Sequence, residues 1–159
     1  MPALPPDFDP IGRSLGRAHK LVRAWADREL APLDASVTDF ILLFQMASAP
    51  PPGRSQIEIA RFSDMGGPAL VRHLDRLERD GIVTRRRDQE DRRVVRVTLT
   101  DAGHARLDEI GEVMARCDER IRAVITPEEA VVLEGALQRL FEFAVGELQI
   151  EPLTMRSQP

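Results

Sequence analysis

The most concentrated chemistry in the chain is the run RRRDQEDRRVVRV, from Arg85 to Val97, which holds six arginines and three acids. A guanidinium presents several donors in a fixed planar fork, and this fork fits phosphate oxygens and the acceptor edge of guanine. The run therefore indicates an anionic partner, nucleic acid in particular. The whole chain, in contrast, is acidic, with a formal net charge of −4.

The charges are unevenly distributed along the sequence. The segment from Arg54 to Arg96 carries eleven arginines and eight acids, a balance of +3, whereas the remaining residues together carry −7. Lys20 is the only lysine among the 22 basic residues. This preference for arginine suits phosphate and guanine recognition, although a genomic codon bias would produce the same excess.

Helical periodicity and capping signals predict the elements that position these cations. Apolar residues recur at helical spacing through most of the chain. Ser36, with Asp39 three residues on, can cap one helix, Ser55 and Glu58 form a capping box, and Thr126 and Glu129 form another. The predicted helices are Ile11–Leu30, one from Ser36 to Ala47, Gln56–Phe62, Pro68–Asp80 closed by Gly81, one from Thr100 to Val124, and one from Thr126 to Leu148.

The period changes between the fourth and fifth of these helices. The stretches IVTRRR and RVVRVTL are short and β-branched, and the polar tip DQED separates them, which predicts a two-stranded hairpin. Two short helices joined by a turn and followed by a basic hairpin are typical of a winged helix-turn-helix. The predicted fold is thus mainly α, with a small β-hairpin wing.

The helix Pro68–Asp80 would be the one that enters the major groove of DNA. Its residues Arg72, Arg76 and Arg79 follow one another at spacings of four and three, so they share a stripe beside the leucines. A solvated helix face, with these arginines paired to neighbouring acids, would show the same pattern. The adjoining basic hairpin favours the DNA-binding interpretation.

The segment IEIARFSDMGGPALVRHLDRLERDGIVTRRRDQEDRRVVRVTLTDAG, from Ile57 to Gly103, resembles the core of the MarR family of bacterial transcription regulators. The motifs LDRLERDGIV, the Asp-x-Arg of DRR, and VTLTDAG carry the resemblance. It implies a repressor more often than an activator, acting as a homodimer on a pseudo-palindromic operator. The apolar stripes of the N- and C-terminal helices support a dimer, because a small winged lobe cannot cover them alone.

The chain departs from the family at the start of the recognition helix. Family members commonly carry Ser, Thr or Gln there, whereas this chain has GGPAL from Gly66 to Leu70. Backbone N–H groups at the helix start can still bind a phosphate, and Ala69 can touch a thymine methyl group. We therefore expect the chain to depend more on DNA shape and on its wing than most relatives do.

The candidate DNA-binding residues lie on the two short helices and the wing. Arg92 and Arg93 at the tip are suited to a narrow minor groove, and Asp91 is suited to orient a guanidinium. Some of the hairpin arginines would contact only phosphate or solvent. The full candidate set is Ser55, Gln56, Gly66, Gly67, Pro68, Ala69, Arg72, His73, Arg76, Arg86, Asp91, Arg92 and Arg93.

Family resemblance also implies a small aromatic or phenolic effector bound between the dimer helices and the winged lobe. His19, Trp25 and Phe44 are candidates to line that site, although residues at helical spacing are more often core. The three histidines lack metal-ligand spacing, so we expect no metal and no cofactor. Cys117 lies on an apolar stripe, which favours a packing role over redox sensing.

The sequence contains no catalytic motif, so we expect no enzyme activity. It also lacks a secretory signal and an apolar run long enough to span a membrane, which predicts a cytoplasmic protein. We expect a flexible arm at 1–9, one MarR-like domain at 10–149, and a tail at 150–159. Within that domain the winged lobe covers about 36–99 and the dimerisation helices cover about 10–30 and 101–149. The alternative function is a winged protein-interaction module that has lost operator binding.

Overall fold

The computed structural model describes residues 10–61, 63 and 65–149. The expected N-terminal arm and C-terminal tail lie outside the described residues, as does Phe62. The elements in chain order are α1 (Ile11–Leu30), the 3-10 turn η1 (Ala31–Leu33), α2 (Val37–Ala47), β1 (Arg54–Ser55), α3 (Gln56–Arg61), α4 (Gly67–Arg79), β2 (Val83–Arg87), β3 (Val95–Leu99), α5 (Asp101–Arg122) and α6 (Pro127–Glu147).

The described residues are mainly helical with one small antiparallel sheet, which confirms the predicted fold class. The hairpin of β2 and β3 pairs Val83 with Leu99 at one end and Arg87 with Val95 at the other. The two-residue strand β1 adds a third strand on the other side of β3, an element that the sequence did not predict. Two residues are too few for an alternation of polar and apolar side chains to appear.

The helix starts are fixed by the capping residues that the sequence indicated. Ser36 and Asp39 form a complete capping box at α2, and Thr126 and Glu129 form another at α6. The recognition helix α4 ends at Arg79, and Gly81 follows with a φ of 74°. A positive φ suits glycine because it has no Cβ, so Gly81 closes the helix as predicted.

One apolar core joins the helices to the sheet. The fully buried side chains come from α1, α2, α3, α4, both hairpin strands and α5, and they are Leu30, Leu42, Leu43, Ile59, Leu74, Val83, Val97 and Ile110. The close packing of α5 onto the hairpin depends on Gly103, where an added Cβ would collide with the backbone carbonyl of Ile82. The core therefore fixes the orientation of α4 and the hairpin relative to α1 and α5.

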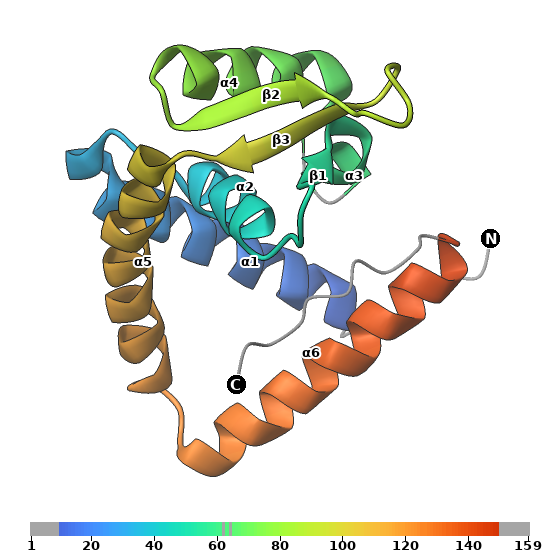
Figure 1. The fold of residues 1–159 in the computed structure, drawn as a ribbon. Helices are drawn as coiled ribbons and strands as arrows, with labels where there is room; N and C mark the ends of the chain where they lie inside the picture. Colours follow the sequence, from blue (N-terminus) through green and yellow to red (C-terminus); the bar gives the residue numbers. More distant parts are fainter. Residues whose placement is uncertain (1–9, 62, 64, 150–159) are drawn as a thin grey trace.

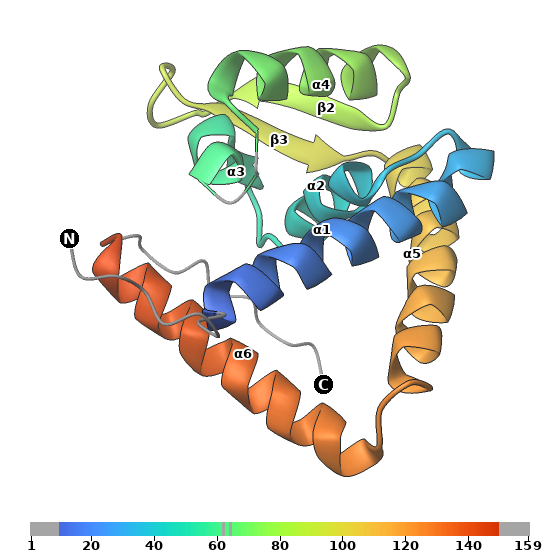
Figure 2. The ribbon, with the colours of Figure 1, turned by 180° about the vertical axis from the view of Figure 1, so that it is seen from behind.

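The winged lobe and α6 lie at opposite ends of the structure (Figure 1). The view from behind shows α6 passing beneath α1 and away from α4 and the hairpin (Figure 2). Of the described residues of α6, only Ala130 is buried. Its large apolar side chains are exposed instead, namely Val131, Val132, Leu133, Leu137, Leu140, Phe141 and Phe143, and so is Leu148 at its C-cap.

Among the described residues, no single helix has both the length and the apolar composition needed to cross a membrane. Residues Ile11–Leu33 and Val37–Ala47 meet that test only when taken as a pair, and the pair is bent by 81°.

Candidate nucleic-acid interface

The first short helix, α3, is held at its start by a capping box. The Ser55 hydroxyl accepts from the Glu58 N–H at 3.1 Å, and a Glu58 carboxylate oxygen accepts from the Ser55 N–H at 2.7 Å. Ser55 is buried and Gln56 is half-buried. Ser55 thus has a structural role at the base of α3, and its predicted contact with DNA remains a prediction.

The second short helix, α4, begins with a surface that lacks polar side chains. Gly66, Gly67 and Pro68 are exposed and Ala69 is half-buried. The N–H groups of Ala69 and Leu70 both donate to the Gly66 carbonyl, at 2.9 and 3.1 Å. Because Pro68 has no N–H, the first turn of α4 has little left with which to hold an anion.

Farther along α4, two of the predicted DNA-binding residues are paired with a buried carboxylate on α2. His73 Nε2 lies 2.9 Å from Asp39 Oδ1, and Arg76 Nη2 donates to the same oxygen at 2.5 Å. Burial alone would raise the pKa of Asp39, yet the hydrogen bonds from His73 and Ser36, with the charge of Arg76, hold that pKa well below its ordinary value. Asp39, His73 and Arg76 therefore form a clamp between α2 and α4.

A second ion-pair cluster joins α4 to the hairpin. Arg85 Nη2 donates to Asp75 at 2.5 Å and to Glu78 at 2.6 Å, and its Nε donates to Glu78 at 2.9 Å. The hydrogen bond from Arg85 lowers the pKa of Glu78, and the same bond raises the pKa of the guanidinium. Arg85 thus fixes the wing to the recognition helix.

The tip of the wing is organised by Asp88. Its Oδ1 accepts from the N–H groups of Glu90 and Asp91 at 2.8 and 3.1 Å, and its Oδ2 accepts from Arg96 Nε at 2.7 Å. The hydrogen bond from Arg96, followed by the two backbone bonds, lowers the pKa of Asp88 to about 2. Asp88 and Arg96 hold the two strands together where the hairpin turns.

The expected orienting role of Asp91 takes a different form in the structure. Its carboxylate accepts from the backbone N–H of Arg93 at 2.9 Å, so it shapes the turn at the tip. The acid that orients a guanidinium is Asp88, three residues earlier. Both residues follow β2, and sequence spacing alone does not tell which carboxylate faces across to β3.

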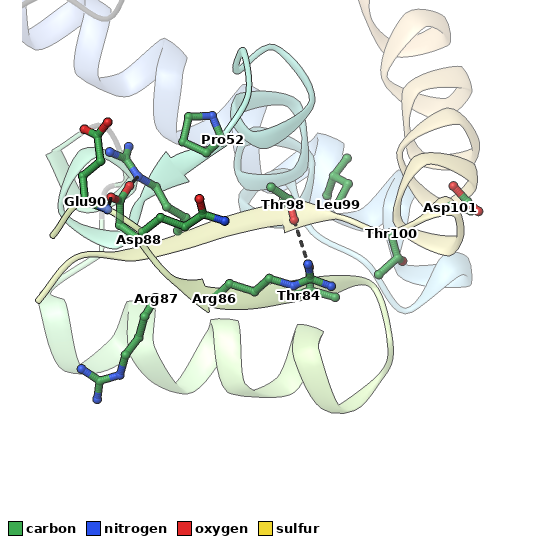
Figure 3. A pocket seen from close by; sticks show the side chains of 12 residues that line it. Pro52, Thr84, Arg86, Arg87, Asp88, Glu90, Thr98, Leu99, Thr100 and Asp101 are labelled. Atoms are coloured by element: carbon green, nitrogen blue, oxygen red, sulfur yellow. Dashed lines mark hydrogen bonds and ion pairs between the residues drawn. The ribbon is translucent and has the colours of Figure 1, made fainter. Parts of the chain in front are cut away.

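Three candidate arginines on the wing remain exposed: Arg86, Arg92 and Arg93. Arg86 lies along the hairpin beside Thr84, whose hydroxyl is 2.9 Å from that of Thr98 (Figure 3). This face borders an open hollow of about 840 Å³. On α4, the exposed cations are Arg72 and Arg79. The structure thus leaves exposed arginines on both the recognition helix and the wing.

Sequence reasoning missed one exposed apolar residue on α4. Val71 is 44% exposed, although Leu70 beside it and Leu74 one turn later are buried. The helical period offered a signal, because Val71 lies away from the leucine stripe. Its side chain shares the outer surface of α4 with Pro68 and Arg72.

The three effector candidates have different surroundings. His19 is exposed on α1, whereas Trp25 packs against the core and donates to Glu29 at 3.0 Å. Arg120 lies over the Trp25 ring at 4.6 Å. Phe44 is 42% exposed and stacks on Phe40 with ring centroids 5.8 Å apart.

Cys117 lies in the packed part of α5, where its residue is only 3% exposed. Burial raises the pKa of its thiol, with a further contribution from the charge of Glu29. A raised pKa reduces the thiolate fraction, and the thiolate is the reactive form. In the part of the chain that the structure describes, no group of three His, Cys, Asp or Glu side chains is arranged to hold a metal ion.

The chain is similar to several proteins of known structure. Residues 33–94 match the sequence model of the MarR family. The transcriptional repressor CouR, bound to a 23-mer DNA duplex, is 30% identical with a TM-score of 0.75, and the match covers 82% of this chain and 92% of CouR.

Two further structures extend the similarity. A Mycobacterium tuberculosis MarR family protein, RV2887, in complex with salicylic acid, is 28% identical with a TM-score of 0.70, covering 84% of this chain and 98% of that protein. The reduced form of MarR from E. coli is 26% identical with a TM-score of 0.72, covering 84% and 98%. With its winged lobe, basic hairpin and long flanking helices, the chain belongs to the MarR family of transcriptional regulators.

Proposed function

We propose that this protein is a sequence-specific regulator that binds double-stranded DNA as a homodimer on a pseudo-palindromic operator, most simply as a repressor. The observation that carries this proposal is the placement of exposed arginines. Arg72 and Arg79 of α4 and Arg86, Arg92 and Arg93 of the wing lie at the end of the molecule opposite α6. A helix and a hairpin that present cations together suit a major groove and the backbone beside it.

The proposed division of labour within the chain follows from burial. The winged lobe, about 36–99, would contact DNA, whereas the helices at about 10–30 and 101–149 would form the dimer. The apolar residues of α6 support this division, as do the exposed apolar residues of α1, which are Ile11, Leu15, Leu21 and Val22. In a two-fold dimer, the apolar surface of one protomer packs against the same surface of its partner. One set of residues therefore forms both halves of the interface.

The dimer can be tested by placing charge on α6. Leu137 and Leu140 are 39% and 42% exposed, so the double variant Leu137→Glu, Leu140→Glu should preserve the fold of the monomer. Burying the exposed part of each leucine contributes about 0.6–1.2 kcal/mol, the two-fold axis doubles the loss, and each new carboxylate would also lose its water at the interface. Sedimentation should therefore show a dimer for the wild type and a monomer for the variant.

A matched control for that experiment is Arg139→Glu, which makes the same change in net charge on the same helix. It should remain a dimer. Monomeric behaviour of the wild type, or dimeric behaviour of the double variant, would contradict the proposed assembly.

DNA binding can be tested by selecting bound duplexes from genomic fragments, followed by footprinting and a salt titration. A dimer that neutralises about six to ten phosphates loses about 10³- to 10⁵-fold in affinity between 50 and 200 mM salt. A protected pair of half-sites about 34–36 Å apart would match two recognition helices in successive major grooves.

The second candidate function is a winged protein-interaction module. The engagement of His73 and Arg76 by Asp39, and of Arg85 by Asp75 and Glu78, favours it because fewer polar groups are then exposed for base contacts. This module would bind no duplex selectively, and any residual binding would not depend on sequence. Selection of a defined operator would rule it out.

We also propose that an aromatic acid regulates DNA binding. The support is a relative, the M. tuberculosis protein RV2887, whose structure contains salicylic acid. Salicylic acid should lower the affinity of the dimer for its selected operator, and Trp25→Phe should weaken this effect if Trp25 lines the site. An unchanged operator affinity at saturating salicylic acid would remove this compound from consideration.

A further inference from the structure

The outer surface of α4, proposed above to enter a major groove, carries apolar side chains near its start. Pro68 and Val71 are exposed on it, whereas Leu70, Leu74 and Leu77 point into the core. Val71 is 44% exposed, so nearly half of its accessible surface is not covered by the protein. Val71 therefore has apolar surface available to a partner.

Four polar side chains of α4 have partners within the protein. His73 and Arg76 contact Asp39, whose residue is only 5% exposed. Asp75 and Glu78 contact Arg85 of the hairpin. Arg72 and Arg79 are the exposed cations on the helix, so hydrogen-bonded base reading by α4 is reduced to very few groups.

The two glycines at the start of α4, Gly66 and Gly67, have open space around them and supply no side-chain contacts. A Cβ built on Gly66 or Gly67 would meet nothing within 4 Å, and neither glycine has a positive φ. The fold itself therefore accepts other residues at both positions. Their small size allows the start of α4, and with it Pro68 and Val71, to lie close to a base-pair edge.

From these observations, and resting on the DNA-binding function proposed above, we infer that α4 reads its half-site by apolar contact with thymine 5-methyl groups, with Val71 as the central residue and Pro68 beside it. In the major groove, only thymine presents a methyl group, so an apolar surface there discriminates between bases. The flanking Arg72 supplies charge for the phosphates or for a single guanine.

The inference can be tested on the DNA rather than on the protein alone. Each thymine of the selected half-site is replaced, one at a time, by deoxyuridine, which removes the 5-methyl group and keeps every hydrogen-bonding atom. Affinity is measured by fluorescence anisotropy at fixed salt. One or two positions should lose about fourfold in affinity per half-site, the value expected for one buried methyl-sized group.

Variants of α4 assign the contact to Val71. Val71→Ala should weaken binding to the thymine operator and should no longer distinguish it from the deoxyuridine operator at the sensitive position. Such non-additivity is the mark of a direct contact. Val71→Thr keeps the side-chain shape and should give a similar loss, and thermal unfolding should confirm that both variants are folded. Arg72→Ala should weaken binding to both operators by the same factor.

The outcomes separate this inference from the proposed function. Equal wild-type affinity for thymine and deoxyuridine at every position of the half-site would overturn it, even with a tightly bound operator. The same conclusion would follow if Val71→Ala retained the full discrimination. Absence of selective binding to any duplex would overturn both the inference and the proposed function.

Discussion

Asp39 is the residue whose replacement tests the placement of α4 most directly. It belongs to α2, but its buried carboxylate accepts from His73 and Arg76 of α4 and also from the N–H and hydroxyl of Ser36. Asp39→Asn keeps an oxygen for the Ser36 N–H and places an uncharged NH2 group where an oxygen accepted from His73 and Arg76. The variant therefore removes the clamp and leaves the cap of α2 in place.

The expected loss in the free energy of unfolding depends on how exposed His73 and Arg76 are. A hydrogen bond to a charged group contributes about 1.5–3 kcal/mol, and Asp39 makes two such bonds to α4. The Arg76 side chain is 39% exposed and can recover water when the charge is removed, whereas the His73 side chain is 15% exposed and recovers less. We therefore expect Asp39→Asn to reduce the free energy of unfolding by about 2–3 kcal/mol, less than the sum of two bonds.

The assay is urea unfolding followed by circular dichroism at one protein concentration, because the stability of a dimer depends on concentration. Asp34→Asn is the matched control, since Asp34 and Asp39 line one cavity of about 160 Å³ and Asp34 is exposed. It should change stability by less than about 0.5 kcal/mol. Equal stability of wild type and Asp39→Asn would refute the clamp.

Three further predictions follow from local contacts. Because the pKa of Asp39 is lower in the folded chain than its ordinary value of 3.8, its contribution is complete above about pH 5 and is lost as the pH falls, so urea titrations should show wild type and Asp39→Asn converging in acid. Gly103→Ala should destabilise the fold by about 1–3 kcal/mol in thermal unfolding, because its Cβ would collide with the backbone carbonyl of Ile82. The control Gly111→Ala, which has open space around the added Cβ, should be neutral or stabilising. Joint replacement of Arg92 and Arg93 by alanine should weaken operator binding and flatten its log–log salt dependence by about 0.9 for each phosphate that is no longer neutralised, and an unchanged slope would show that these arginines do not bind phosphate.

Local signals in the sequence predicted most of the fold. The capping boxes at Ser36 and Thr126 and the closing Gly81 depend on neighbours within a few residues, and the structure contains all three. Strand β1 depends on pairing Arg54 with Val97, forty-three positions away, and no local pattern reports such a pairing.

The sequence indicated which residues belong to the candidate site, but it did not indicate which side chains pair with one another. The arginine run indicated a wing, and its exposed members Arg86, Arg92 and Arg93 lie there. The use of Asp39 as the partner of His73 and Arg76 could not be predicted, because it joins α2 to α4 across 34 and 37 positions. Side-chain pairs at such separations depend on tertiary packing rather than on helical period.

The arginine-rich run now separates into two groups with different physical roles. Arg85 and Arg96 are held by acids, the first by Asp75 and Glu78 and the second by Asp88 and Glu58, so they build the wing. The exposed arginines of the same run carry charge to the surface. The acids of DQED thus do not simply dilute a basic patch, since Asp88 fixes the turn that presents it.

This separation explains why an acidic chain can still present a cationic face to DNA. The paired arginines cancel local acids inside the lobe, whereas the exposed ones are concentrated on α4 and the hairpin. The exposed arginines attract any duplex, and this attraction weakens as the salt concentration rises. They therefore contribute to affinity more than to sequence selectivity. Selectivity comes from contacts at the base edges and from DNA shape. On α4 the exposed candidates for base-edge contacts are Arg72, Arg79 and an apolar surface at Pro68 and Val71. The thymine-to-deoxyuridine series changes a base methyl group and leaves the charge of the duplex unchanged. It therefore tests recognition that charge alone cannot provide.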